Sequence, residues 1–187
     1  MMLPLASLIH ECAPTVAPIT MAAIVQAESG GHPWALWDNT AKRGYYPKSR
    51  KEALRILRVL MAQGHQVDVG IAQVDTENFA QYHLTARTAL NACQNLRAGS
   101  RILRAAWQKA RSHGLSGQAA LEHAFEVYNS GHLFGDYAYV QRVLGAAGAP
   151  VFLQVSVPGA NLPGFHPNPW PQYTWTTKPA QTWSVLP

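Results

Sequence analysis

Glu28 has a sequence setting that suits acid catalysis. It comes at the carboxyl end of an apolar, helix-forming stretch, 19–29, and two glycines follow at positions 30 and 31. Apolar surroundings and the negative end of a helix dipole both disfavour a charged carboxylate, so both are expected to raise the pKa of Glu28. A raised pKa allows a carboxylic acid to donate a proton near neutral pH. The alternative is an ordinary surface glutamate in the last turn of a helix.

A second segment of chemical interest is Gly70-Ile71-Ala72-Gln73. A glycine opens an apolar run that a single amide interrupts. The side chain of Gln73 both donates and accepts hydrogen bonds, which suits recognition of an acetamido or peptide group. The alternative is a buried strand or turn whose glutamine is satisfied within the protein.

A third segment is Tyr128-Asn129-Ser130-Gly131. It places a phenol beside an amide at a glycine-terminated helix end, and glycine is common where a helix stops. Such a pair can hold a carboxyl group in place and contact a sugar. The alternative is a helix stop with a core tyrosine.

The elements that must position these segments are short helices. A capping box, Ser49-x-x-Glu52, starts one helix with apolar residues at helical spacing, and Gly64 ends it. Further helices are predicted over residues 19–29, 96–110, 118–128 and 137–146. The run 38–47 fits a short hairpin. The fold class is therefore mainly α, with roughly six to eight short helices.

The composition changes near residue 150, which divides the chain into a domain, 1–149, and a tail, 150–187. The 38 residues of the tail hold eight prolines, three tryptophans and a single charged residue. Proline at this density prevents helix and interrupts strand ladders, so an irregular tail is expected. The tail is either uncommitted or a partner-binding strap whose tryptophans fill pockets.

The composition also limits the classes of partner. The 187 residues carry 15 Lys and Arg against 10 Asp and Glu, a net charge of +5, which suits an anionic partner. No dense basic block or basic stripe with interleaved aromatics is present, so nucleic-acid binding is not expected. No apolar run approaches the roughly 20 residues of a membrane-spanning helix, so no integral membrane segment is expected.

Cys12 and Cys93 leave two interpretations open. They fit one disulfide in an oxidising compartment and equally two buried thiols. No Cys-x-x-Cys pair occurs and the eight histidines are scattered without ligand spacing, so neither a metal site nor a cofactor is predicted. The amino-terminal stretch 1–13 lacks the basic region of a secretory signal, which leaves the route of export open.

Taken together, the three segments are specific. In this order and at these distances, residues 28–30, 70–73 and 128–131 resemble the three motifs of the lytic transglycosylases that have the lysozyme-like (goose-type, or soluble transglycosylase) domain. The resemblance covers about residues 10–148. The family usually has Leu-Met where this chain has Ile71-Ala72.

Three other segments resemble a particular subgroup of that family. Residues 12–18, 62–70 and 91–99 look like the transglycosylases that accompany type IV secretion and conjugation machines. The resemblance implies peptidoglycan glycan strands as the substrate and the periplasm as the place of work. Secretion-machine subunits are candidate partners for the tail 150–187, which the resemblance does not cover with any specificity.

The resemblance assigns roles to individual residues. Glu28 is the implied catalytic acid, and Tyr128 is expected to orient it through a hydrogen bond. Cys12 and Cys93 are expected to form a disulfide. The residues implied to contact the substrate are Ser29, Gly70, Ile71, Ala72, Gln73 and Asn129.

The implied reaction uses one carboxylate, whereas most glycosidases need two. Glu28 would protonate the glycosidic oxygen, and the C6 hydroxyl of the same sugar would then attack C1 and close a 1,6-anhydro ring. Of the other acids near the motifs, Asp68 is expected to hold a turn and Asp75 to cap a helix.

Two other functions remain open. One is a hydrolytic lysozyme that activates water with an acid such as Asp68, and the other is a non-catalytic wall-binding assembly factor.

Overall fold

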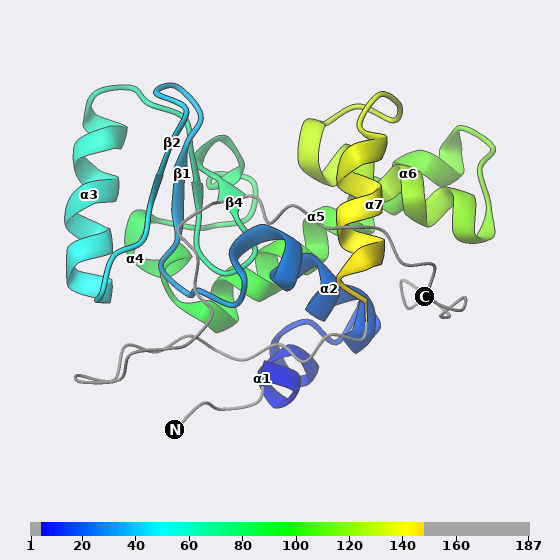
Figure 1. Ribbon diagram of the computed structural model, residues 1–187, viewed down its shortest axis with the longest axis horizontal. Coiled ribbons are helices and arrows are strands. Elements are labelled where there is room, and N and C mark those ends of the chain that lie inside the picture. Colours follow the sequence, from blue (N-terminus) through cyan, green and yellow to red (C-terminus); the bar gives the residue numbers. More distant parts are fainter. Residues whose placement is uncertain (1–4, 148–187) are drawn as a thin grey trace.

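The computed structural model describes residues 5–147 of the chain (Figure 1). Within this range the protein is mainly helical and has one small antiparallel sheet, which confirms the predicted fold class. The predicted domain boundary near residue 150 and the tail 150–187, with its tryptophans, lie outside the described residues.

Helices make up most of the described range. The α-helices are α1 (Leu5–Cys12), α2 (Pro18–Ser29), α3 (Arg50–Ala62), α4 (Ala86–Ala89), α5 (Ala92–Ser112), α6 (Gly117–Ser130) and α7 (Tyr137–Gly145), and a 3-10 helix, η1, spans Thr76–Asn78. These seven α-helices of residues 5–147 agree with the predicted number. The longest of them, α5, has 21 residues and runs through the middle of the molecule (Figure 1).

The sheet contains four very short strands. They are β1 (Leu36–Asp38), β2 (Arg43–Tyr45), β3 (Val67–Val69) and β4 (Val74–Asp75), and their order in the sheet is β2-β1-β3-β4. All neighbouring pairs are antiparallel. The hairpin predicted over residues 38–47 is formed by β1 and β2, slightly earlier in the chain than expected.

Helix α3 begins at the predicted cap. The Ser49 side chain accepts a hydrogen bond from the Glu52 N–H, with an N···O distance of 3.2 Å. The Glu52 carboxylate accepts from the N–H of Lys48 at 2.9 Å, one residue earlier than in a standard capping box. Buried Leu57 and Leu60 turn the apolar face of α3 towards the sheet, so the helix covers one side of it (Figure 1).

Two hydrophobic clusters lie on either side of α5. The helical cluster gathers buried residues of α1, α2, α5, α6 and α7, among them Ile24, Leu103 and Phe125. The sheet cluster gathers residues of the strands, α3 and α4, among them Leu36 and Leu57. Because α5 contributes to both clusters, it fixes the position of the sheet side relative to the helical side.

The disulfide between Cys12 and Cys93 is present, which confirms the expected pairing. It joins the end of α1 to the start of α5 across a sequence separation of 81 residues. A cross-link that closes a loop of this length removes chain entropy from the unfolded state worth about 4 kcal/mol. The bond therefore anchors the amino-terminal helix to the central helix.

Helix α2 carries Glu28 in its last turn and is apolar on all sides. Its buried residues include Met21, Ile24 and Val25. The helix ends at Gly30, which adopts the left-handed conformation with φ 60° and donates its N–H to the Gln26 carbonyl. Among residues 5–147, no helix has both the length and the apolar character needed to cross a membrane.

Candidate active site

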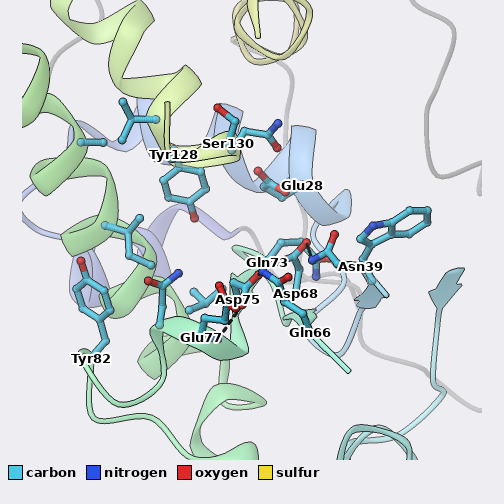
Figure 2. Close-up of a pocket in the computed structure, with 18 of the residues that line it drawn as sticks. Glu28, Asn39, Gln66, Asp68, Gln73, Asp75, Glu77, Tyr82, Tyr128 and Ser130 are labelled. Atoms are coloured by element: carbon cyan, nitrogen blue, oxygen red, sulfur yellow. Dashed lines mark hydrogen bonds between the residues drawn. The ribbon is translucent and has the colours of Figure 1, made fainter. Parts of the chain in front are cut away.

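A cavity of about 750 Å³ separates the sheet side of the molecule from the helical side. Figure 2 shows its polar lining, with Glu28 and Tyr128 contributed by helices and Asp68, Gln73 and Asp75 contributed by the sheet side. These side chains come from α2, α6, β3, β4 and the turn before β4. The segments singled out in the sequence therefore meet at one site.

Glu28 lies in this cavity under conditions that favour its protonated form. Burial raises its pKa from the ordinary 4.5 to about 7, and the nearby Asp136 adds a smaller contribution in the same direction. The hydroxyl of Tyr139 and the charge of Arg142 act in the opposite direction and limit the rise. A carboxyl group with a pKa near 7 can donate a proton at neutral pH and accept one afterwards.

The hydroxyl that contacts Glu28 belongs to Tyr139 of α7. It donates a hydrogen bond to Glu28 Oε1 with an O···O distance of 2.5 Å. Tyr139 is only 1% exposed, and the Arg142 guanidinium lies 4.8 Å from the centre of its ring. Sequence reasoning missed this residue, because its place in a predicted helix gives no sign that it faces an acid 111 residues away.

Tyr128 does not make the contact that was expected of it. Its hydroxyl donates to the Ala72 carbonyl oxygen at 2.7 Å, so the single hydroxyl proton is not available for Glu28. The ring still lines the cavity. Gly99 of α5 makes this arrangement possible, because a Cβ there would lie 2.8 Å from the Ala72 Cβ and 3.0 Å from the Tyr128 hydroxyl.

The turn between β3 and β4 is held in place by the side chain of Asn95, which belongs to α5. This buried side chain accepts from the Ala72 N–H at 2.8 Å and donates to the carbonyls of Val69 and Ala89 at 2.8 and 2.9 Å. Gly70 has φ 83°, and a Cβ at this position would lie 2.6 Å from the Asn95 amide nitrogen. The turn therefore needs glycine at this position and the amide of Asn95 beneath it.

Gln73 ends this turn and lines the cavity. Its backbone has φ 47°, an uncommon conformation for a residue with a side chain. The side-chain nitrogen donates to the carbonyls of Ala35 and Gly70 at 3.1 and 2.7 Å. Since both amide protons are used in this way, the side-chain oxygen is the group left for a ligand.

Four of the residues expected to contact the substrate instead support the turn. Ile71 and Ala72 have no exposed surface and pack in the helical cluster. Gly70, at the start of the turn, is also buried. The Ser29 hydroxyl donates to the Ile71 carbonyl at 2.7 Å, which ties the end of α2 to the turn. These four residues, which were expected to contact the substrate, are not among those that line the cavity, whereas Gln73 and Asn129 do line it.

Asp68 and Asp75 lie directly opposite each other on β3 and β4 and both line the cavity. Asp75 caps η1 as predicted, accepting from the Glu77 N–H at 2.7 Å. Asp68 was expected to hold a turn, but it lies on β3 between two buried valines and points to the other face of the strand, where Asn39 donates to it at 2.9 Å. Burial and then the negative charges of Asp75 and Glu28 raise the Asp68 pKa to about 8.

Within residues 5–147, no group of three or more His, Cys, Asp or Glu side chains is arranged to hold a metal ion. The side chains that line the cavity offer proton transfer, hydrogen bonding and charge. The cavity combines one acid poised near neutrality with amide and carboxyl groups that face it.

The chain is similar to one protein family and to several curated proteins. The family model described as the transglycosylase SLT domain matches residues 7–136. The type IV secretion system protein virB1 of Brucella suis biovar 1 is 39% identical over 155 residues, which cover 78% of this chain and 65% of that protein. Protein virB1 of Agrobacterium tumefaciens is 34% identical over 140 residues, covering 74% of this chain and 58% of that protein. The chain thus spans less than two thirds of the length of these relatives. No solved structure matches it.

Proposed function

The chain belongs to the transglycosylase SLT domain family, and from this premise we propose that it is a peptidoglycan lytic transglycosylase. It would cleave the β-1,4 bond between C1 of N-acetylmuramic acid and O4 of N-acetylglucosamine. The observation that carries the proposal is the position of Glu28 in the cavity, with a pKa of about 7 and a hydrogen bond from Tyr139.

The first step is the cleavage of the glycosidic bond. Protonated Glu28 donates its proton to O4, and the C1–O4 bond breaks with its electron pair going to the oxygen. The acetamido group of the muramic acid stabilises the positive charge at C1. The hydroxyl of Tyr139 stabilises the Glu28 carboxylate as it forms, because a hydrogen bond to a charged acceptor is stronger than one to a neutral acceptor.

The second step closes a ring within the same sugar. The C6 hydroxyl oxygen attacks C1, and the Glu28 carboxylate takes the hydroxyl proton, which restores the acid for the next cycle. No water is consumed, and the product carries a 1,6-anhydro end. Gln73 and Asn129 would orient the sugar by contacting its acetamido or peptide groups.

The raised pKa of Asp68 supports this reaction over hydrolysis. A hydrolytic lysozyme on the same scaffold would need a second carboxylate to activate water. Asp68 lines the cavity, and burial raises the pKa of its carboxyl group above its ordinary range, which disfavours the carboxylate form that would activate water. A wall-binding assembly factor, in turn, would not need an acid poised near neutrality.

The biological role follows the names of the relatives. Two proteins named virB1, one of them described as a type IV secretion system protein, share 34–39% identity with this chain. We extend that context to this protein, which would open the wall locally in the periplasm for such an apparatus. The Cys12–Cys93 disulfide fits an oxidising compartment. The tail 150–187 is the segment proposed to contact the machine.

Mass spectrometry of the soluble products from purified peptidoglycan tests the reaction, with Glu28→Gln as the matched variant. Products that lack one water, with 1,6-anhydro muramic ends, are expected from the wild type and not from the variant. Products with a free reducing end would identify a hydrolase. Wall binding without products from either protein would identify a binding module.

A further inference from the structure

Two lysines line the cavity from opposite walls. Lys42 comes from the sheet side, at the end of the turn between β1 and β2, and Lys109 comes from the helical side, near the end of α5. The other ionisable acidic or basic side chains of the described residues that line the cavity are the carboxyl groups of Glu28, Asp68, Asp75 and Glu77. The lining therefore combines four carboxyl groups with two ammonium groups, one from each side of the cavity.

The local structure fixes where each lysine is attached. The turn before Lys42 is built on buried Asp38, which accepts from the N–H groups of Thr40 and Ala41 at 3.0 and 2.9 Å and pairs with His65 at 2.8 Å. Lys42 itself has φ 53°, a conformation that the surrounding turn must impose. A charged side chain is thus presented on an anchored turn and not on a loose loop.

Lys109 is anchored through its ammonium group. Its Nζ donates to the carbonyl oxygen of Gly131 at 2.9 Å, at the start of the loop between α6 and α7. An ammonium group has three N–H donors, so two remain for a ligand in the cavity. In Figure 1 this loop and the β1–β2 turn stand at the top of the helical side and the sheet side, respectively.

Among residues 5–147, neither lysine is paired with a carboxylate. The ion pairs of the described part of the chain join His65 to Asp38 and His123 to Glu126. The ammonium groups of Lys42 and Lys109 therefore lie more than 4 Å from the carboxylates that share the cavity with them, which leaves both positive charges for an anion from outside.

We propose that Lys42 and Lys109 bind carboxylates of the peptide stems that peptidoglycan carries, so that the enzyme prefers glycan strands whose stems have free carboxylates. The inference rests on the proposed function. The sugar chain lies over Glu28 on the cavity floor, and the stems leave it through the lactyl group of muramic acid. Stems that leave the sugar chain pass between the two sides of the cavity. There the ammonium groups of Lys42 and Lys109 meet the carboxylates of the stems.

The test compares two forms of the same soluble strands. In one form the stem carboxylates are free, and in the other they have been converted to amides, which removes the charge and keeps the length. The wild type is expected to show a kcat/KM about threefold to tenfold higher on the free form, because solvent-exposed charge pairs are individually weak. Raising the ionic strength should reduce this preference.

Variants separate the lysines from general effects. Lys42→Met and Lys109→Met should each bring the ratio of kcat/KM on the free form to kcat/KM on the amidated form closer to one, chiefly through KM. Lys109→Arg should retain the wild-type ratio because arginine keeps the charge. Lys51 lies exposed on α3 away from the cavity, so Lys51→Met should keep the wild-type preference.

The outcomes distinguish the inference from the proposed function. Equal cleavage of both forms by the wild type, or an unchanged preference in both lysine-to-methionine variants, would overturn the inference and leave the transglycosylase intact. Cleavage of neither form by the wild type would overturn the proposed function, and the inference with it.

Discussion

Tyr139 of α7 donates a hydrogen bond of 2.5 Å to Oε1 of Glu28 at the end of α2. Burial of Glu28 raises its pKa to about 7, and this hydrogen bond is the largest influence in the opposite direction. The tyrosine hydroxyl therefore keeps the acid from becoming too weak to ionise during the reaction. It acts as a positioning residue, because it reaches the reaction through Glu28.

Tyr139→Phe should raise the Glu28 pKa above 7 and slow the enzyme. Without the donor, the carboxylate that forms in the first step loses a charge-assisted hydrogen bond worth roughly 1.5–3 kcal/mol, so kcat should fall about 10-fold to 100-fold. The pH profile of kcat/KM distinguishes the loss of the hydrogen bond from a packing defect. The part of the profile that reports the ionisation of Glu28 should move to higher pH when the hydrogen bond is lost.

Tyr128→Phe is the matched variant for that experiment. Its hydroxyl contacts the Ala72 carbonyl and not Glu28, so its loss should reduce stability and activity without moving the pH profile. A profile that shifts in Tyr128→Phe and stays in place in Tyr139→Phe would reverse the assignment of the two tyrosines.

Gly99→Ala should disturb the turn that carries Gln73. The new methyl group would lie 2.8 Å from the Ala72 Cβ and 3.0 Å from the Tyr128 hydroxyl, so α5, α6 and the turn must move apart. Overpacking of this kind costs about 1–3 kcal/mol. Thermal unfolding should show the loss, and activity should fall further than stability alone explains.

Gly145→Ala provides the control for that substitution. Gly145 ends α7, and a Cβ there would meet no heavy atom within 4 Å. Alanine at this position should be neutral or stabilising by up to about 1 kcal/mol. Equal effects of the two substitutions would show that the close approach at Gly99 is not tight.

The sequence predicts the helices well because their signals are local. The Ser49 cap, the stop at Gly30 and the stop at Gly131 depend on residues within one or two turns, and the structure places all three as predicted. Glu28 was identified on similar grounds, since a helix end and apolar neighbours can be read directly. Its position in a cavity could not be read in the same way.

The sequence does not predict the partners of the site, because these depend on contacts between distant segments. Tyr139 contacts Glu28 although 111 residues separate them in the sequence. The hydrophobic pattern of α7 does not distinguish Tyr139 from an ordinary core residue. The sequence predicts a turn at Asp68, because a strand of three residues is too short to display an alternating pattern. The burial of Ile71 and Ala72 follows from the packing of the turn against α5 and α6.

Reduction of the disulfide should destabilise the protein substantially. The chain has only two cysteines, so a reductant acts on the Cys12–Cys93 bond alone. Closure of the 81-residue separation is worth about 4 kcal/mol, and Cys12→Ala with Cys93→Ala should lose a similar amount. Thermal melts with and without reductant measure this. A melting temperature that reductant does not change would contradict the cross-link.

Glu28→Gln should make the stability of the protein less dependent on pH. The Glu28 pKa has its ordinary value of 4.5 in the unfolded state and is about 7 in the folded protein. Between these two pH values, the folded state holds the proton and the unfolded state does not. The free energy of unfolding of the wild type therefore falls as pH rises through this window, by roughly 3 kcal/mol in total.

Glutamine resembles protonated glutamate in shape and charge, so the variant and the wild type should be similarly stable at pH 4, and the variant should be more stable at pH 8. Part of that gain comes from Asp68, because the charge of Glu28 is one of the causes that raise its pKa. Asp68→Asn should show the same sign over a window that extends to about pH 8. Urea unfolding at pH 4, 6 and 8 measures both. A constant difference between Glu28→Gln and the wild type across this range would mean that burial does not hold the proton on Glu28, and the acid would then have to be sought elsewhere in the cavity.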